Sequence, residues 1–235
     1  MLEYIIIMSL ILSIETSTTV CSVALTRDGS TLSTQKLFLE KSHSTLLTVV
    51  IQSLLDHTEV RKEDLSAIAV SKGPGSYTGL RIGVSTVKGL CYALDKPLIA
   101  INTLHAMVQE VSQYGVANEW LCPMLDARRM EVYTSLFDAN LNEMEKTKAL
   151  VLDESSFHET LDQNNVLFFG NGSDKFKDLI GSNDRARFVK DVTPSASAVG
   201  VLAATALEQG QTENVAYFEP FYLKDFMATK PKKLL

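Results

Sequence analysis

Cysteine is scarce in this 235-residue chain, and its 3 cysteines lie far apart in the sequence. Cys21, Cys91 and Cys122 are odd in number and form no CxxC pair, so the sequence contains neither a disulfide framework nor a cysteine-based metal or redox motif. The 4 histidines form no HxxxH or HExxH pair, which removes the usual zinc signatures. These absences predict a reducing, cytoplasmic compartment and no bound metal.

Long apolar runs are also missing. The most apolar stretch, residues 5–14, is too short to span a bilayer and lacks the basic flank and cleavage site of a secretory signal. We interpret it as a buried strand and expect no membrane association. Met8 stands directly before this strand, so we interpret residues 1–7 as an extension from an upstream start.

The chain has no excess of positive charge. It contains 22 Lys plus Arg against 28 Asp plus Glu, a net charge of -6, which argues against a broad grip on a phosphate backbone. A small basic cluster, Lys230, Lys232 and Lys233, lies in a polar tail at residues 225–235, and we interpret it as a solvated terminus. Any RNA contact must therefore be local or shared with a partner.

What the sequence does contain is an alternation of β-rich and helical segments. Strands are expected at residues 10–15, 20–27, 31–39, 66–71, 97–101, 120–126, 131–137 and 166–169. Helices are expected at residues 42–57, 76–94, 104–114 and 195–208, and from residue 173. The pattern predicts an α/β protein with two lobes that each open with a hairpin. We place the first lobe at residues 8–107 and a smaller one at 108–224, whose last helix can pack back on the first.

A glycine-rich turn, Lys-Gly-Pro-Gly-Ser-Tyr-Thr-Gly at residues 72–79, joins a strand to a helix. Such a junction can favour an anion, but the P-loop spacing fails because no Lys-Ser/Thr follows the second glycine. The dinucleotide pattern fails because Thr78 occupies the place of its third glycine. We therefore predict a fold-specific turn of unusual backbone geometry, built from Gly73, Pro74, Gly75 and Gly79.

The helices on either side of this turn predict an interface. Gly79 and Gly83 share a helix face, which packs against either the chain's own sheet or another subunit. The preceding helix carries no charge from residue 42 to 55, and its apolar residues cover more than one stripe, which favours a subunit interface. The predicted interface residues are Leu46, Leu47, Val50, Ile51, Leu54, Gly79, Gly83, Thr86 and Leu90.

Four blocks of sequence resemble one protein family. They are Ile-Leu-Ser-Ile-Glu-Thr-Ser at residues 11–17, the glycine turn with its continuation to residue 90, Leu-Asp-Ala-Arg-Arg-Met-Glu-Val-Tyr at 125–133, and Tyr-Leu-Lys at 222–224. Together they resemble the TsaB (YeaZ) family. The resemblance implies the two-lobed fold of actin-like and sugar-kinase ATPases, with mixed sheets flanked by helices.

The resemblance also implies a role. It implies a non-catalytic subunit that binds the catalytic paralogue TsaD, together with the ATPase TsaE. That assembly transfers threonylcarbamoyl to the adenosine 3′ of the anticodon in tRNAs that read codons beginning with A. The paired helices at residues 42–57 and 76–94 resemble the family's surfaces for homodimers and for TsaD. The chain is expected to be a homodimer when alone and to meet tRNA through the complex.

The fold normally holds nucleotide phosphates between two hairpins, here residues 15–19 and 126–130, with adenosine at a glycine turn. The candidates for a vestigial nucleotide cleft are Glu15, Thr16, Ser17, Asp126, Arg128, Gly170 and Gly172. The two carboxylates could hold Mg²⁺ or orient water. Alternatively, Glu15 satisfies a tight turn and Asp126 pairs with Arg128 or Arg129. We prefer this alternative because the second lobe looks too short for a full nucleotide site. We expect no cofactor, with ATP or ADP only at an interface with TsaD.

The resemblance places the two metal-binding histidines of TsaD-like proteins at Thr103 and Met107, and neither residue replaces an imidazole ligand. His105 lies between them and is interpreted as a surface or capping residue. Two other functions stay open: an autonomous ATPase or kinase of the same fold, and a peptidase. The sequence has neither a GxSxG elbow nor an HExxH motif to favour the latter.

Overall fold

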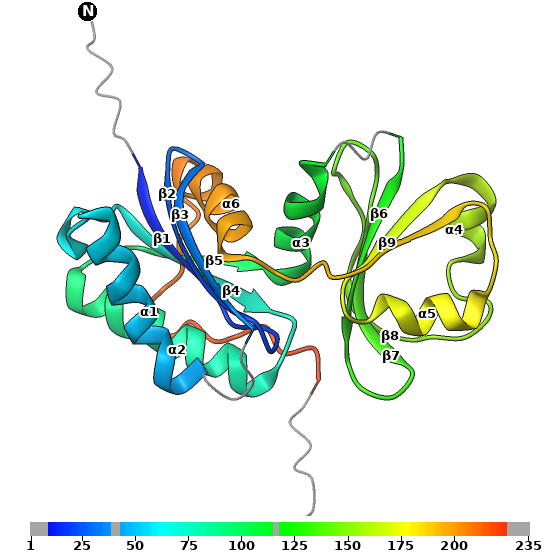
Figure 1. The fold of residues 1–235 in the computed structure, drawn as a ribbon, viewed down its shortest axis with the longest axis horizontal. Coiled ribbons are helices and arrows are strands. Elements are labelled where there is room, and N and C mark those ends of the chain that lie inside the picture. Colours follow the sequence, from blue (N-terminus) through cyan, green and yellow to red (C-terminus); the bar gives the residue numbers. More distant parts are fainter. Residues whose placement is uncertain (1–8, 39–42, 115–117, 225–235) are drawn as a thin grey trace, which may run out of the picture.

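The computed structural model describes residues 9–38, 43–114 and 118–224, which form two α/β lobes side by side (Figure 1). The first lobe contains strands β1 (Leu10–Glu15), β2 (Cys21–Arg27), β3 (Ser30–Leu37), β4 (Ala67–Gly73) and β5 (Leu98–Asn102). Its helices are α1 (His43–Thr58), a 3-10 turn η1 (Lys62–Asp64), α2 (Tyr77–Leu94) and α3 (Thr103–Ser112). The predicted extension at residues 1–7 and the basic tail at 225–235 lie outside the described residues.

The second lobe contains strands β6 (Trp120–Asp126), β7 (Glu131–Phe137), β8 (Glu143–Val151), β9 (Val166–Phe169) and β10 (Ala186–Val189). The remaining helices are α4 (His158–Gln163), α5 (Ser173–Ile180) and α6 (Ala196–Glu208). Every segment expected from the sequence is present, with ends that differ by at most two residues. The sequence analysis missed β8, α4 and β10.

Both sheets have the same topology. The first has the order β3-β2-β1-β4-β5 and the second, read from the matching end, β8-β7-β6-β9-β10. In each sheet the first three strands in sequence pair antiparallel, and the fourth and fifth add in parallel. The chain is therefore a structural duplication, although the two halves share no obvious sequence repeat.

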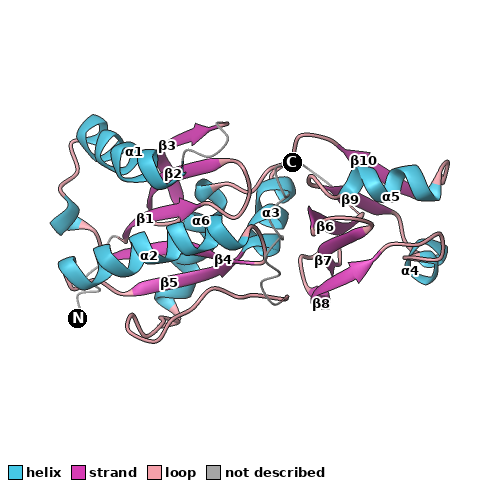
Figure 2. Ribbon diagram, turned by 90° about the horizontal axis from the view of Figure 1, so that it is seen from below, coloured by secondary structure: helices cyan, strands magenta, loops and turns pink. Residues whose placement is uncertain are grey.

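The two sheets and their helices form successive layers (Figures 1 and 2). Helices α1 and α2 cover one face of the first sheet, and α6 covers the other. Helix α3 packs against both sheets, and α4 and α5 cover the outer face of the second. The boundary predicted at residues 107 and 108 thus falls inside a helix shared by both lobes. None of the helices in the described residues combines the length and apolarity of a membrane span.

Helix α6 follows the second lobe in sequence but packs on the first sheet. Its buried face consists of small residues, which let its backbone approach the strands closely. At Gly200 a Cβ would lie 2.5 Å from Thr26 Cγ2 and 2.9 Å from Ser13 Oγ, so only glycine fits there without a shift of its neighbours. The small-residue composition of this helix therefore reflects packing inside the molecule.

After α6, residues 211–224 run back along the first lobe, and we call this segment the C-terminal strap. Phe218 inserts into the core beneath α1 and α2. Lys88 Nζ donates hydrogen bonds to the carbonyl oxygens of Ala216 (3.1 Å) and Phe218 (2.8 Å), and Phe221 N donates to Lys72 O (2.7 Å). The strap ends at Lys224, which contacts the β6–β7 hairpin of the second lobe.

Candidate functional site

The glycine-rich turn between β4 and α2 is locked by neighbouring backbone. Gly73 has a φ of +114°, and a Cβ there would lie 2.6 Å from the carbonyl oxygen of Phe221 in the strap. A Cβ on Gly75 would clash with the carbonyl oxygen of Ser17, which accepts a hydrogen bond from Ser76 N at 2.6 Å. Ser76 also caps α2 through its hydroxyl. The turn thus fixes α2 between the β1–β2 turn and the strap.

The shared face of Gly79 and Gly83 points into the molecule. Thr16 Oγ1 donates a hydrogen bond to Gly79 O (2.8 Å), and a Cβ on either glycine would clash with Thr16. The predicted contact of these glycines with another subunit is therefore corrected. They allow α2 to lie directly against the β1–β2 turn, which was the alternative left open by the sequence.

The predicted interface residues of α1 need a similar correction. Four of them are buried in the core of the first lobe, namely Leu47, Val50, Ile51 and Leu54. The reason is that a single sheet face, together with α2 and the strap, buries a wider apolar stripe than we expected. Leu46, Thr86 and Leu90 are half-buried.

A different set of residues forms the outer side of this helix pair. We define the α1–α2 outer surface as the exposed, uncharged residues Thr45, Thr48, Val49 and Gln52 of α1 and Thr78, Ser85, Gly89 and Ala93 of α2. Val49 is 59% exposed although it is apolar. Gly89 has no atom within 4 Å of the position of a Cβ, so internal packing does not explain this glycine.

In the first hairpin, Glu15 lies at the end of β1 and is completely buried. Its Oε1 accepts a hydrogen bond from Ser17 N at 2.5 Å, as expected for a tight turn. Its Oε2 has no hydrogen-bond partner among the described residues. Burial raises the pKa of this carboxyl, outweighing the nearby hydroxyls of Ser17 and Ser71, because the charged form loses its hydration.

In the second hairpin, Asp126 has different partners from those we predicted. Its Oδ1 accepts hydrogen bonds from the backbone N of Arg128 (2.6 Å) and from Lys175 Nζ (2.6 Å), so the expected ion pair with an arginine side chain is wrong. Asn171 Oδ1 accepts from Asp126 N at 2.9 Å. Sequence reasoning missed Lys175 because a lysine on α5 has no local signal that links it to a residue 49 positions earlier.

The glycine turn at residues 170–172 is packed against β6. Gly170 has a φ of +98°, and a Cβ there would lie 2.7 Å from the Met107 side chain. A Cβ on Gly172 would lie 2.9 Å from Leu125, and Gly172 N donates to Met124 O at 3.0 Å. All three parts of the predicted cleft therefore contact the chain itself: this turn packs against β6, Glu15 is buried, and Asp126 pairs with Lys175.

The two positions at which the resemblance to TsaD-like proteins predicts metal-binding histidines lie on α3. Thr103 and Met107 are fully buried, and Thr103 Oγ1 shares a 2.7 Å hydrogen bond with Ser71 Oγ. His105 points elsewhere, with Nε2 3.1 Å from Glu143 Oε1 and its ring edge-on to Phe137. In residues 9–38, 43–114 and 118–224 there is no cluster of three or more His, Cys, Asp or Glu side chains able to hold a metal ion.

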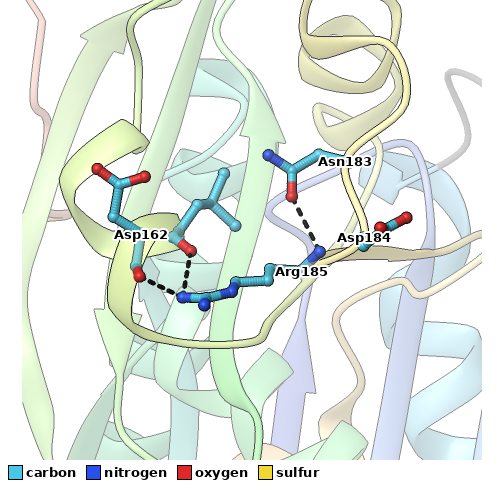
Figure 3. A pocket seen from close by; sticks show the side chains of 5 residues that line it. Asp162, Asn183, Asp184 and Arg185 are labelled. Atoms are coloured by element: carbon cyan, nitrogen blue, oxygen red, sulfur yellow. Dashed lines mark hydrogen bonds between the residues drawn. The ribbon is translucent and has the colours of Figure 1, made fainter.

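Two surface cavities lie away from these hairpins. One of about 400 Å³ is polar and lies beside α4, where Arg185 Nη1 donates to the carbonyl oxygens of Leu161 (3.2 Å) and Asp162 (Figure 3). Arg185 therefore caps the C-terminal end of a helix. The other, of about 500 Å³, lies between α2 and the strap and is lined by residues that include Gly89 and Tyr92.

Known proteins match most of the length of this chain. The family model described as TsaD, tRNA N6-adenosine threonylcarbamoyltransferase, matches residues 37–232. The tRNA threonylcarbamoyladenosine biosynthesis protein TsaB of Escherichia coli is 31% identical over 94% of this chain and 96% of its own length. TsaB of Bacillus subtilis is 38% identical, over 54% of each chain.

The fold agrees with these matches. The solved structure of YeaZ from Pseudomonas aeruginosa superimposes with a TM-score of 0.81 and 26% identity, over 92% of this chain and 100% of that one. The expected two-lobed actin-like fold with mixed sheets is thereby confirmed. The chain belongs to the TsaB (YeaZ) family of tRNA threonylcarbamoyladenosine biosynthesis proteins.

Proposed function

We propose that the chain is a non-catalytic, cytoplasmic subunit that docks TsaD and, with TsaE, supports threonylcarbamoyl transfer to the adenosine 3′ of the anticodon in tRNAs reading codons that begin with A. The observation that carries the proposal is that the chain keeps the fold of the family but lacks residues that could bind a catalytic metal ion at α3. The α3 positions for metal ligands are Thr103 and Met107, both buried, and the cleft carboxylates are engaged internally. A protein of this family without these groups can act on the reaction through its partner.

The docking surface that we propose is the α1–α2 outer surface. It combines an exposed valine with a mid-helix glycine that has open space around it, and α1 carries no Asp, Glu, Lys or Arg between residues 43 and 55. Charged residues are depleted at the centre of protein interfaces, and a glycine permits close approach of a partner helix. The same surface would form the homodimer of the isolated chain, and we place any ATP or ADP at the contact with TsaD.

Reconstitution tests the role in the reaction. Modification of an unmodified tRNA transcript by TsaD and TsaE should collapse when this chain is omitted and return when it is added back. If TsaD and TsaE modify the tRNA equally well without it, the proposed function is wrong.

Val49→Glu tests the surface. The charge lies on the exposed side of α1, so the variant should keep its circular dichroism spectrum and melting temperature while light scattering shows that it no longer associates with TsaD. Val151→Glu is the matched control, because it places the same charge on an exposed valine of the other lobe. Val50→Glu cannot serve, since it would bury a charge in the core. If Val49→Glu still associates fully with TsaD, the α1–α2 outer surface is not the docking surface.

The contacts that the two hairpin carboxylates make inside the chain also argue against an autonomous ATPase. Because Glu15 is enclosed and Asp126 is neutralised by Lys175, calorimetric titration of the isolated chain with Mg-ATP should give no binding heat. Binding that is abolished by Asp126→Ala would favour the ATPase instead.

A further inference from the structure

The β6–β7 hairpin presents two arginines in an unfavourable backbone conformation. Arg128 and Arg129 have φ angles of 70° and 52°, and both side chains are exposed. The left-handed region costs an L-residue about 1–2 kcal/mol and is best tolerated by Gly, Asn and Asp. The turn therefore carries two residues that its backbone geometry disfavours, and strained residues of this kind concentrate at functional positions.

The charges around the hairpin are arranged so that the two arginines remain uncompensated. Lys175 pairs with Asp126, and Lys224 pairs with Glu131. The guanidinium groups of Arg128 and Arg129 make no hydrogen bond or ion pair with any residue in the described parts of the chain. Two neighbouring positive charges are thus free in a chain whose net charge is -6.

The backbone that carries the arginines is held from several directions. Asp126 Oδ1 accepts from Arg128 N at 2.6 Å, and Ala127 N donates to Glu131 O at 3.1 Å. Lys224 at the end of the strap donates to Ala127 O at 3.4 Å, and its ammonium lies 5.8 Å from the ring centroid of Tyr133. A fixed backbone lowers the entropy cost of binding by the exposed side chains.

We propose that Arg128 and Arg129 contact phosphate groups of the RNA backbone, giving the complex a local tRNA contact on this subunit. Guanidinium groups bind phosphate oxygens with paired hydrogen bonds. Both arginines are exposed at the tip of the hairpin, where an extended phosphate backbone can reach them. The proposal rests on the proposed function, because a single pair of charges needs a partner to supply the rest of the RNA affinity.

The test uses the double variant Arg128→Asn with Arg129→Gly, whose new residues suit the left-handed turn. We expect a melting temperature equal to or above that of the wild type. In complex with TsaD, affinity for an unmodified tRNA transcript, measured by fluorescence anisotropy, should fall on the order of tenfold, and the slope of log affinity against log salt should decrease by about 1–2. Arg128→Lys with Arg129→Lys should retain most of the affinity.

A matched control removes the same charge elsewhere. Arg27→Ala with Lys62→Ala changes two exposed cations on the first lobe that form no ion pair with the described residues, and it should leave tRNA affinity unchanged. Equal losses in both double variants would mean a general charge effect and would overturn the proposal, as would unchanged affinity in the hairpin variant. Loss of ADP binding with tRNA affinity intact would assign the arginines to a nucleotide. The proposed function fails separately, if omitting the chain leaves modification undiminished.

Discussion

The glycines of α2 differ in what surrounds them, and this difference can be measured. A methyl group on Gly79 would meet the backbone carbonyl oxygen of Thr16, so Gly79→Ala should destabilise the protein by about 1–3 kcal/mol. Gly89→Ala adds the same methyl group to open space and should stabilise the helix by about 0.5–1 kcal/mol. Urea denaturation of both variants measures the contrast. Equal effects would mean that α2 does not rest on the β1–β2 turn.

Glu15 should make stability depend on pH. Burial raises the pKa of this carboxyl in the folded protein above the usual 4.5. The protonated form therefore stabilises the fold fully below pH 4.5, and this stabilisation is lost as the pH rises through the folded pKa. Gln cannot ionise, so the stability of Glu15→Gln should rise relative to that of the wild type as the pH increases from 5 to 8. Denaturation curves at both pH values give the measurement.

The control for this experiment is Glu63→Gln, which makes the same change on an exposed residue of η1. Its stability difference from the wild type should be the same at both pH values. A pH-independent difference for Glu15→Gln as well would contradict the burial of an ionisable carboxyl.

At the scale of elements, the strap depends on one lysine of α2. Lys88 Nζ donates to two strap carbonyl groups, so Lys88→Met should loosen residues 211–224 while the sheets stay intact. Hydrogen exchange followed by mass spectrometry should show roughly tenfold faster exchange in the strap, the effect of about 1.4 kcal/mol of lost local stability. Lys62→Met, on η1, should exchange like the wild type. Protection of the strap in both variants would show that Phe218, the hydrogen bond from Phe221 N to Lys72 O and the contacts of Lys224 hold it without Lys88.

The elements also show where sequence reasoning succeeds. Segments with strong periodicity or clear turn signals, such as β1, β2 and α2, could be placed to within a residue or two. Strand β8 could not, because none of its residues is fully buried and its sequence has no apolar alternation. Helix α4 has 6 residues and strand β10 has 4, too few to display a period.

The candidate site was harder to predict because it depends on contacts between distant residues. The sequence shows that α1 and α2 are unusual, but it does not show which side of α1 the sheet buries. Val50 of the predicted interface is therefore buried, and its neighbour Val49 is exposed. Likewise, Arg128 was evident in its motif, whereas Lys175 and Lys224 reach the hairpin only through the folded chain.

At the scale of the whole molecule, the first lobe is built from two separate stretches of sequence. Residues 9–112 alone lack α6, so the sheet face that carries Ile11, Ile99 and Ile101 would be exposed to water. We expect this fragment to bind a hydrophobic dye and to melt without cooperativity. Joining it through a flexible linker to residues 191–224 should restore a cooperative transition. A cooperative transition in residues 9–112 alone would contradict this dependence on α6.

The packing of α6 also affects how the protein is made. A ribosome completes the five strands of the first sheet and then synthesises the entire second lobe before α6 emerges, an interval on the order of ten seconds at bacterial rates of elongation. During this time the apolar back of the first sheet has no cover. The nascent chain is therefore prone to aggregation for a time that depends on the order of these segments in the sequence and on the rate of translation. Slower translation of the second lobe would prolong that time.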